Sequence, residues 1–206
     1  MDLQFYGANC VSVTYKGTRL VIDDNLAELG AKAILKADDV ALFTGAAPEG
    51  VNARLVFAGP GEYEVSDISI IGVAARAHVD EDGLKATMFK LIAGDVSVLF
   101  TGHVYPQLSE AQLESIGMVD VMVVPVGGNG YTVDPVGALK LIKEVEPKLV
   151  VPTYYSDKAL KFPVPPQDLA NALKELGMEP KETVAKLKLK GGELSDLTQL
   201  VVLEKS

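Results

Sequence analysis

The strongest constraint on the fold is a β-hairpin pattern that occurs once in each half of the chain. Residues 11–22 predict two short strands joined by a turn at Lys16-Gly17, and residues 88–100 repeat the pattern. Polar residues follow the last strand of each hairpin, with Asp23 after the first and His103 close behind the second. This repetition predicts two β-rich halves.

Three helix signals alternate with short apolar strands after the second hairpin. Ser109 and Gln112 form a capping-box pattern, and Asp134 precedes a proline at a first helical position. A third helix opens at Pro165-Pro166-Gln167-Asp168 and stops at Gly177. The apolar faces expected for the second and third helices comprise Val136, Leu139, Ile142 and Val145, and Leu169, Leu173 and Leu176. Without a low-complexity linker, we predict a single α/β (α+β) domain over residues 1–206, with helices outside the strands.

Two other segments are predicted from composition. Leu26–Lys36 is rich in Ala and Leu, which predicts a short helix interrupted at Gly30. Lys186–Lys190 predicts a closing strand with three lysines on one face. A nucleic-acid-binding stripe is one interpretation of these lysines, but a solvent-facing edge strand protected by lysine is favoured.

Charge and hydropathy limit the partners and the location. The net charge of −9 and pI near 4.7 disfavour binding to nucleic acid or to an anionic membrane surface. No apolar run reaches the ~20 residues that a membrane span needs, and the first residues lack a signal-peptide pattern. We therefore expect a cytoplasmic protein.

Cys10 is the only cysteine, which excludes an intramolecular disulfide.

Eight short motifs, in this order, resemble the metallo-β-lactamase superfamily, and specifically its small lactonase-like hydrolases. The motifs are Asn9-Cys10, Thr44 after a strand, Pro60-Gly61-Glu62-Tyr63, Ala77-His78, Thr101-Gly102-His103, Val124-Pro125-Val126-Gly127-Gly128, Thr132-Val133-Asp134-Pro135 and Val151-Pro152-Thr153-Tyr154-Tyr155. The resemblance covers almost the whole chain. It implies an αββα four-layer metallo-β-lactamase-like sandwich with a site on loops at one edge, where two sheets meet.

The metal ligands that this resemblance implies are mostly missing. The first metal motif of the family is Thr-His-x-His-x-Asp-His, but here Thr44 is followed by Gly-Ala-Ala-Pro-Glu-Gly, with Glu49 in place of the aspartate. The middle histidine of the family matches His78, whereas its bridging carboxylate and last histidine fall at His103 and Tyr154. Because a catalytic zinc needs about three protein ligands, a dinuclear zinc centre is not expected.

Seven residues are predicted to line the residual pocket: Asp23, Glu49, Glu62, His78, His103, Asn129 and Tyr154. We expect no cofactor, although His78 and His103 with Glu49 or Asp23 could hold a single divalent metal. Alternatively, the two histidines are leftovers of the lost centre.

Two functional hypotheses follow from the resemblance. The first is a non-hydrolytic binding or regulatory domain for an unidentified small molecule or protein, without nucleic acid or membrane as partner. The second is a metal-dependent hydrolase of lactone or phosphodiester bonds with a rebuilt mononuclear site. The sequence leaves the oligomeric state open.

Overall fold

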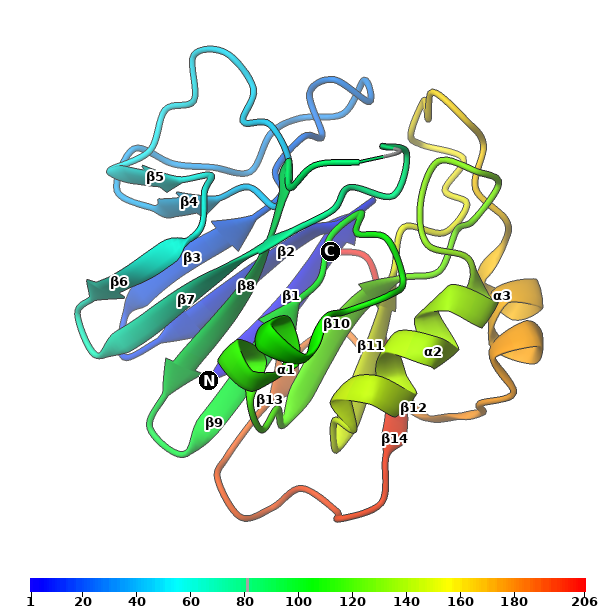
Figure 1. The fold of residues 1–206 in the computed structure, drawn as a ribbon. Helices are drawn as coiled ribbons and strands as arrows, with labels where there is room; N and C mark the ends of the chain where they lie inside the picture. The colour runs from blue at the N-terminus through cyan, green and yellow to red at the C-terminus, as the bar shows by residue number, and fades with distance from the viewer. Residues whose placement is uncertain (81) are drawn as a thin grey trace.

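Two β-sheets pack face to face in the computed structural model, which describes residues 1–80 and 82–206 (Figure 1). The first sheet has six strands in the order β13-β1-β2-β3-β4-β5. Their bounds are β1 Asp2–Gly7, β2 Cys10–Tyr15, β3 Thr18–Ile22, β4 Val40–Leu42, β5 Leu55–Phe57 and β13 Leu187–Lys188. The predicted first hairpin is confirmed, since β2 and β3 are antiparallel partners, whereas β3, β4 and β5 run parallel.

The second sheet has eight strands in the order β12-β14-β11-β10-β9-β8-β7-β6. Their bounds are β6 Gly61–Val65, β7 Ile68–Ala75, β8 Ala86–Ala93, β9 Val96–Phe100, β10 Val121–Pro125, β11 Leu149–Thr153, β12 Pro180–Val184 and β14 Gln199–Leu203. The antiparallel pair β8–β9 confirms the second predicted hairpin. From β9 to β12 the neighbouring strands are parallel, so the loops after β9, β10 and β11 leave the sheet at one end.

The main core lies between the two sheets because the strands bury alternate side chains on that side. In β3, for example, Leu20 and Ile22 belong to this core, whereas Val21 packs on the opposite face of the sheet. Phe89 and Phe100 are fully or almost fully buried in the same layer. The predicted α/β sandwich is confirmed.

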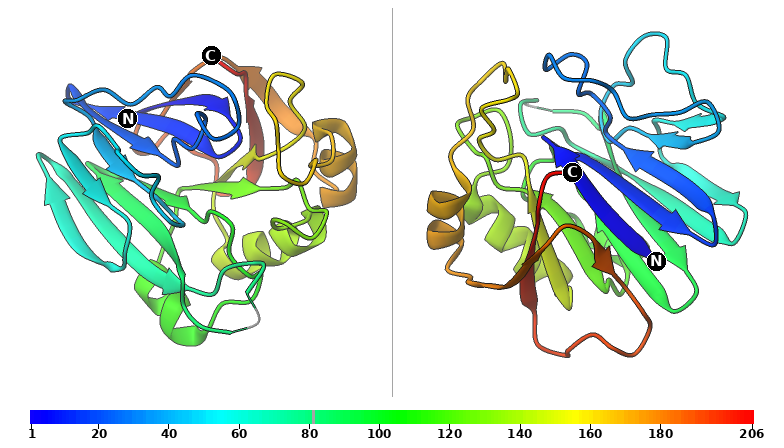
Figure 2. Two further views of the ribbon diagram at one scale, coloured as in Figure 1. Left: turned by 90° about the horizontal axis from the view of Figure 1, so that it is seen from above. Right: turned by 180° about the vertical axis from the view of Figure 1, so that it is seen from behind.

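The three helices of the described residues cover the outer face of the eight-stranded sheet (Figure 2). They are α1 (Glu110–Ile116), α2 (Pro135–Val145) and α3 (Leu169–Leu176). The capping box at Ser109 and the N-caps at Asp134 and Asp168 are present, with Gly117 and Gly177 as the C-caps of α1 and α3. Among the described residues, no helix has the length and apolar character needed to span a bilayer.

The predicted apolar face of α2 is partly wrong. Ile142 and Val145 are buried as predicted, but Val136 is 67% exposed, and the stripe is completed by Ala138 and Leu141. These residues recur at three- and four-residue spacing and so form one stripe against the sheet. Val136 lies outside that stripe.

The helix predicted over Leu26–Lys36 is absent: residues 26–30 form turns and residues 32–36 are irregular. Asp24 explains part of the difference because its Oδ2 accepts the backbone N–H groups of Ile34 and Leu35 at 2.7 and 2.8 Å. Such side-chain bonds compete with helical backbone bonds. Leu26 and Leu29 still pack against the outer face of the six-stranded sheet, so turns rather than a helix cover this part of it.

The C-terminal strands also differ from prediction. The predicted strand Lys186–Lys190 shortens to Leu187–Lys188, at the edge of the six-stranded sheet, as expected for a lysine-protected edge. Sequence analysis missed β12, another edge strand, because Pro180–Val184 is mostly exposed and lacks apolar alternation.

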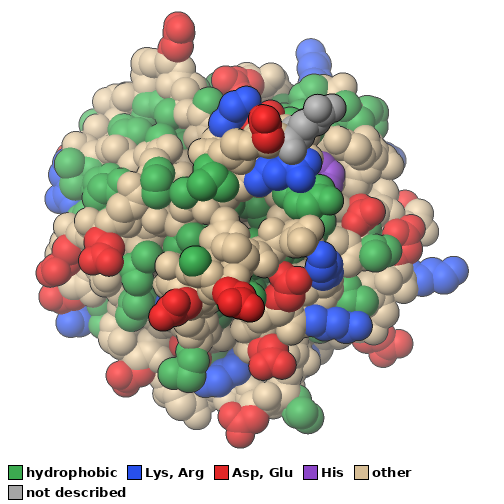
Figure 3. Space-filling model, in the orientation of Figure 1, with side chains coloured by type: hydrophobic (Ala, Val, Ile, Leu, Met, Phe, Trp, Pro, Cys, Tyr) green, Lys and Arg blue, Asp and Glu red, His purple; other side chains and the backbone are tan. Residues whose placement is uncertain are grey.

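Charges of both signs are spread over the face shown in Figure 3. Asp and Glu side chains are distributed across much of this surface, with Lys and Arg between them. The described part of this face therefore shows no continuous basic band of the kind that nucleic-acid-binding surfaces carry. That nucleic acid is not a partner stays a prediction.

Candidate functional site

A cavity of about 540 Å³ opens at the end of the sheets where the loops after β3, β4, β9 and β11 gather. Three residues of the predicted pocket lie together in it: Asp23, His103 and Tyr154. The full lining is Ala8, Asn9, Asp23, Asn25, Glu28, Leu29, Thr44, Gly45, Ala46, His103, Tyr131, Tyr154, Lys161 and Pro163.

Asp23 lies directly after β3 and is held by Thr44, which follows the parallel strand β4. The backbone N–H of Thr44 donates to Asp23 Oδ1 at 2.7 Å, and its hydroxyl donates to Oδ2 at 2.6 Å. Burial raises the pKa of Asp23 to about 6, although both bonds from Thr44 act in the opposite direction. Gly102 leaves room for this pair because a Cβ there would lie 2.1 Å from Thr44 Oγ1.

His103 is the centre of a hydrogen-bond chain from β11 to the loop before α2. Thr153 Oγ1 donates to Asn9 Oδ1 at 2.8 Å, and Asn9 Nδ2 donates to His103 Nε2 at 3.1 Å. The other ring nitrogen, Nδ1, therefore carries the proton and donates to Thr132 Oγ1 at 2.6 Å. Burial, followed by the proximity of His78, lowers the pKa of His103 to about 4, so the ring is neutral near pH 7.

Two tyrosines form an aromatic wall of the cavity. The rings of Tyr131 and Tyr154 are stacked, with centroids 5.7 Å apart and planes 17° apart, and the rings of His103 and Tyr154 are almost perpendicular, at 89°. Tyr154 has a left-handed φ of 52°, as do Ala8 at 50° and Asp23 at 52°, which also line the cavity. Non-glycine residues adopt this conformation at an energetic cost, and such residues cluster at functional sites.

Four residues of the predicted pocket lie outside the cavity lining. Glu49 is exposed in the loop after β4. Glu62 is exposed on β6, the edge strand of the eight-stranded sheet, and lines a separate hollow. This position at the edge places Glu62 outside the cavity. Asn129 points to the neighbouring loop, where its Nδ2 donates to the Pro165 carbonyl at 2.6 Å.

His78 is joined to His103 through the backbone rather than through the cavity. The backbone N–H of His78 donates to the His103 carbonyl at 2.8 Å, but its side chain does not belong to the cavity lining. Its Nδ1 is buried, with no hydrogen-bond partner among the described residues. Burial is the main cause that lowers the pKa of His78.

The residues whose hydrogen bonds fix Asp23 and His103 in place were not predicted as site residues. Asn9, Thr44 and Thr132 belong to the motifs of the resemblance, but each was only a marker of position. The available signal was weak: a polar residue placed at the end of a strand or next to a glycine turn. The partners of Asn9 and Thr44 are distant in sequence, so local patterns could not identify the bonds.

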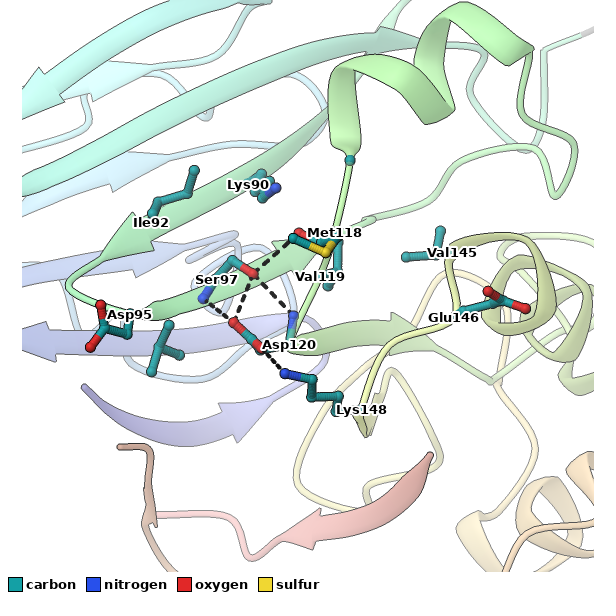
Figure 4. Close-up of a pocket in the computed structure, with 12 residues that line it drawn as sticks. Lys90, Ile92, Asp95, Ser97, Met118, Val119, Asp120, Val145, Glu146 and Lys148 are labelled. Atoms are coloured by element: carbon teal, nitrogen blue, oxygen red, sulfur yellow. Dashed lines mark hydrogen bonds and ion pairs between the residues drawn. The ribbon is translucent and has the colours of Figure 1, made fainter. Parts of the chain in front are cut away.

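A second cavity, of about 650 Å³, lies away from this site and has a structural explanation (Figure 4). The Asp120 carboxylate accepts from the backbone N–H of Ser97 at 2.9 Å and from Lys148 Nζ at 3.0 Å, which joins β9, β10 and β11. Lys90 donates to the Ile116 carbonyl at 2.6 Å and so satisfies the C-terminus of α1. These polar groups are engaged in holding strands and a helix together.

A family model described as "Beta-lactamase superfamily domain" matches residues 2–154. This chain belongs to the beta-lactamase superfamily. A structure described as a Zn-dependent hydrolase of the metallo-beta-lactamase superfamily, from Thermotoga maritima, is 25% identical, with a TM-score of 0.74 and 98% of each chain covered.

Two more distant structures share the fold of this beta-lactamase superfamily domain. A metallo hydrolase from Ignicoccus hospitalis is 17% identical, with a TM-score of 0.60 and coverage of 92% of this chain and 99% of that one. The metallo-beta-lactamase fold protein YhfI from Bacillus subtilis is 10% identical, with a TM-score of 0.59 and coverage of 100% and 97%, respectively. No curated protein matches this chain.

The donor groups of the cavity do not fit the zinc centre that the superfamily implies. Gly45 and Ala46 line the cavity but carry no donor side chain. Both nitrogens of His103 and both carboxylate oxygens of Asp23 are hydrogen-bonded to protein groups. Within residues 1–80 and 82–206, no group of three or more His, Cys, Asp or Glu side chains could hold a metal ion. A zinc site would need about three such ligands.

The chain through His103 predicts a stability effect. Replacing Asn9 with Ala should lower the free energy of unfolding by about 1–3 kcal/mol, because His103 Nε2 and Thr153 Oγ1 both lose a partner in a buried setting. Urea unfolding measures this effect, with Asn52→Ala on the exposed surface as a control expected to stay within about 0.5 kcal/mol of the natural chain. Equal stability of the two variants would contradict the assigned hydrogen-bond chain.

Proposed function

We propose that this beta-lactamase superfamily domain is a non-hydrolytic binding or regulatory domain whose cavity at Asp23, His103 and Tyr154 holds a small molecule. One observation carries the proposal: both ring nitrogens of His103 and both carboxylate oxygens of Asp23 are already hydrogen-bonded to other protein groups. Zinc hydrolases use a metal-bound hydroxide as the nucleophile. His103 and Asp23 are not available as ligands for such a metal.

The shape and lining of the cavity support ligand binding. Its volume of about 540 Å³ falls in the range of small-molecule sites, which is roughly 300–1,000 Å³. Aromatic walls at Tyr131 and Tyr154 with a few polar groups, such as Asp23 and Asn25, are also typical of such sites. Left-handed backbone at three lining positions indicates that the surrounding structure holds the cavity in a fixed shape.

A metal-dependent hydrolase of lactone or phosphodiester bonds is the second candidate. The unpartnered, buried Nδ1 of His78 favours it, because a ring nitrogen without a hydrogen bond is free to bind a metal ion. Similarity to a protein described as a Zn-dependent hydrolase favours it as well. A rebuilt mononuclear site would have to bring His78 together with two further ligands, because no group of three ligands exists among the described residues.

An activity assay separates the two candidates. The purified chain would be incubated with a lactone, a carboxylic ester and a phosphodiester, each with and without added Zn²⁺ or Mn²⁺. We expect no hydrolysis above that of buffer containing the same metal. Metal-dependent turnover by the natural chain, lost in His78→Ala but kept in the exposed-surface variant Asn52→Ala, would instead establish the hydrolase.

A further inference from the structure

The buried carboxylate of Asp23 lines the cavity without a cation beside it. Its hydrogen-bond donors are the N–H and hydroxyl of Thr44, both uncharged, and no Lys, Arg or His of the described residues forms an ion pair with it. Only 5% of Asp23 is exposed. Because burying a charge without an opposite charge is unfavourable, a cation placed in the cavity would be attracted to this carboxylate.

Asn25 adds an acceptor without a partner on the same loop. Its Oδ1 is buried and accepts no hydrogen bond from any group of the described residues, although the side chain lines the cavity. A buried carbonyl oxygen without a donor loses hydrogen-bond energy that a ligand N–H would restore. Asp23 and Asn25 therefore both favour a ligand that donates hydrogen bonds.

The other charged residues of the cavity also favour a cationic ligand. Glu28 contributes a second carboxylate and Lys161 is the one cation among the described lining residues; both side chains are exposed. The ring of His103 is neutral near pH 7 and both of its nitrogens are engaged. The cavity therefore carries more negative than positive charge.

The aromatic wall suits the body of such a ligand. Tyr131 and Tyr154 are stacked and line the cavity, and Phe162 packs against Tyr154 with ring centroids 5.1 Å apart. Aromatic faces bind apolar groups and attract cations by the charge distribution of the ring.

We propose that the cavity binds an organic ammonium compound, whose N–H groups donate to Asp23 and Asn25 and whose apolar or aromatic body lies against Tyr131 and Tyr154. This inference rests on the proposed binding function and names the ligand class for it. Binding forms no covalent bond: the ammonium group donates hydrogen bonds to the two side chains, and its charge balances the Asp23 carboxylate.

Three probes of matched shape and different charge test the ligand class: 2-phenylethylamine, 2-phenylethanol and phenylacetate. Each would be titrated into the ¹⁵N-labelled chain, and the shifts of the Asn25 side-chain amide and of the Thr44 backbone amide would be followed by NMR. We expect the amine to bind at least about tenfold more tightly than the alcohol, since pairing with a buried carboxylate contributes more than about 1.4 kcal/mol. Phenylacetate should bind more weakly than either.

Variants assign the effect to the named residues. Asp23→Asn should remove the preference for the amine over the alcohol, and Tyr131→Leu should weaken both probes. The matched control is Glu182→Gln, which removes a carboxylate from the exposed edge strand β12 and should change neither affinity.

The possible results separate this inference from the proposed function. If phenylethanol or phenylacetate binds in the cavity as tightly as the amine, the ammonium class is wrong while a binding function stands. If none of the probes shifts the two amides, or if the amine shifts them equally in Asp23→Asn, the inference is also overturned. The proposed function itself fails separately, through metal-dependent hydrolysis in the activity assay.

Discussion

A double variant, Gly45→His with Ala47→His, is expected to bind about one zinc ion per chain, unlike the natural sequence. These two positions follow Thr44 where the superfamily motif has histidines. Gly45 has ordinary backbone geometry and open space around an added Cβ, so a side chain fits there. His78 matches the middle metal-binding histidine of the superfamily, and its Nδ1 has no hydrogen-bond partner among the described residues, so we expect it to supply the third ligand. Equilibrium dialysis followed by metal analysis measures the gain.

Two controls make the zinc result specific. Gln at the same two positions adds side chains of similar size that are poor zinc ligands, and this variant should remain without zinc. Adding His78→Ala to the histidine variant should weaken zinc binding by at least about tenfold, because it removes one of three ligands. If the histidine variant retains no more zinc than the Gln control, the alignment of this loop with the metal motif is in error.

Asp23→Asn should make the chain more stable than its parent at pH 7, and the difference should disappear in acid. The pKa of Asp23 is about 6 in the folded chain, compared with an ordinary value of 3.8 for this side chain. Between pH 4 and pH 6 the folded state therefore binds more protons than the unfolded state, so the contribution of Asp23 is stabilising at low pH and is lost as pH rises. This rise in the pKa corresponds to a loss of about 3 kcal/mol in the free energy of unfolding when Asp23 ionises. Asparagine cannot ionise, so the Asp23→Asn variant avoids this loss. Asn at this position can still accept from the Thr44 N–H.

Urea unfolding of both proteins from pH 4 to pH 7 measures this difference. The comparison between the two chains is essential, because the pKa values of Asp120 and Asp157 are lowered and these groups change stability in the opposite sense. Subtracting one curve from the other cancels their contribution. A difference that does not vary with pH would show that Asp23 is not buried as a charge.

The parts of the fold predicted from sequence are those that local chemistry determines. The two hairpins depend on a short turn between strands, and the helix ends depend on caps such as Ser109 and Asp134. Where tertiary contacts decide, prediction failed. The segment Leu26–Lys36 has helical composition, but its backbone bonds to Asp24, and β12 has no apolar pattern because it lies at an edge.

The candidate site was predictable only in outline. Asp23 follows β3 of the six-stranded sheet, whereas His103 and Tyr154 follow β9 and β11 of the eight-stranded sheet. The structure brings all three into one cavity because these strands end on the same side of the sandwich. The bond from Asn9 to His103 spans 94 positions and the bond from Thr153 to Asn9 spans 144. Contacts between residues so far apart cannot be read from spacing, and the same is true of the separation of Glu62 from the cavity.

Zinc titration of the natural chain tests the central claim most directly. Protein purified without chelators would be analysed for metal and then titrated with Zn²⁺, with crystals examined at the zinc absorption edge. We expect no stoichiometric metal and no anomalous peak near His78 or His103, because Asp23 and His103 are hydrogen-bonded to protein groups and no three-ligand group exists among the described residues. Two metal ions at full occupancy in the cavity would contradict the account and assign this chain to the working hydrolases of its superfamily.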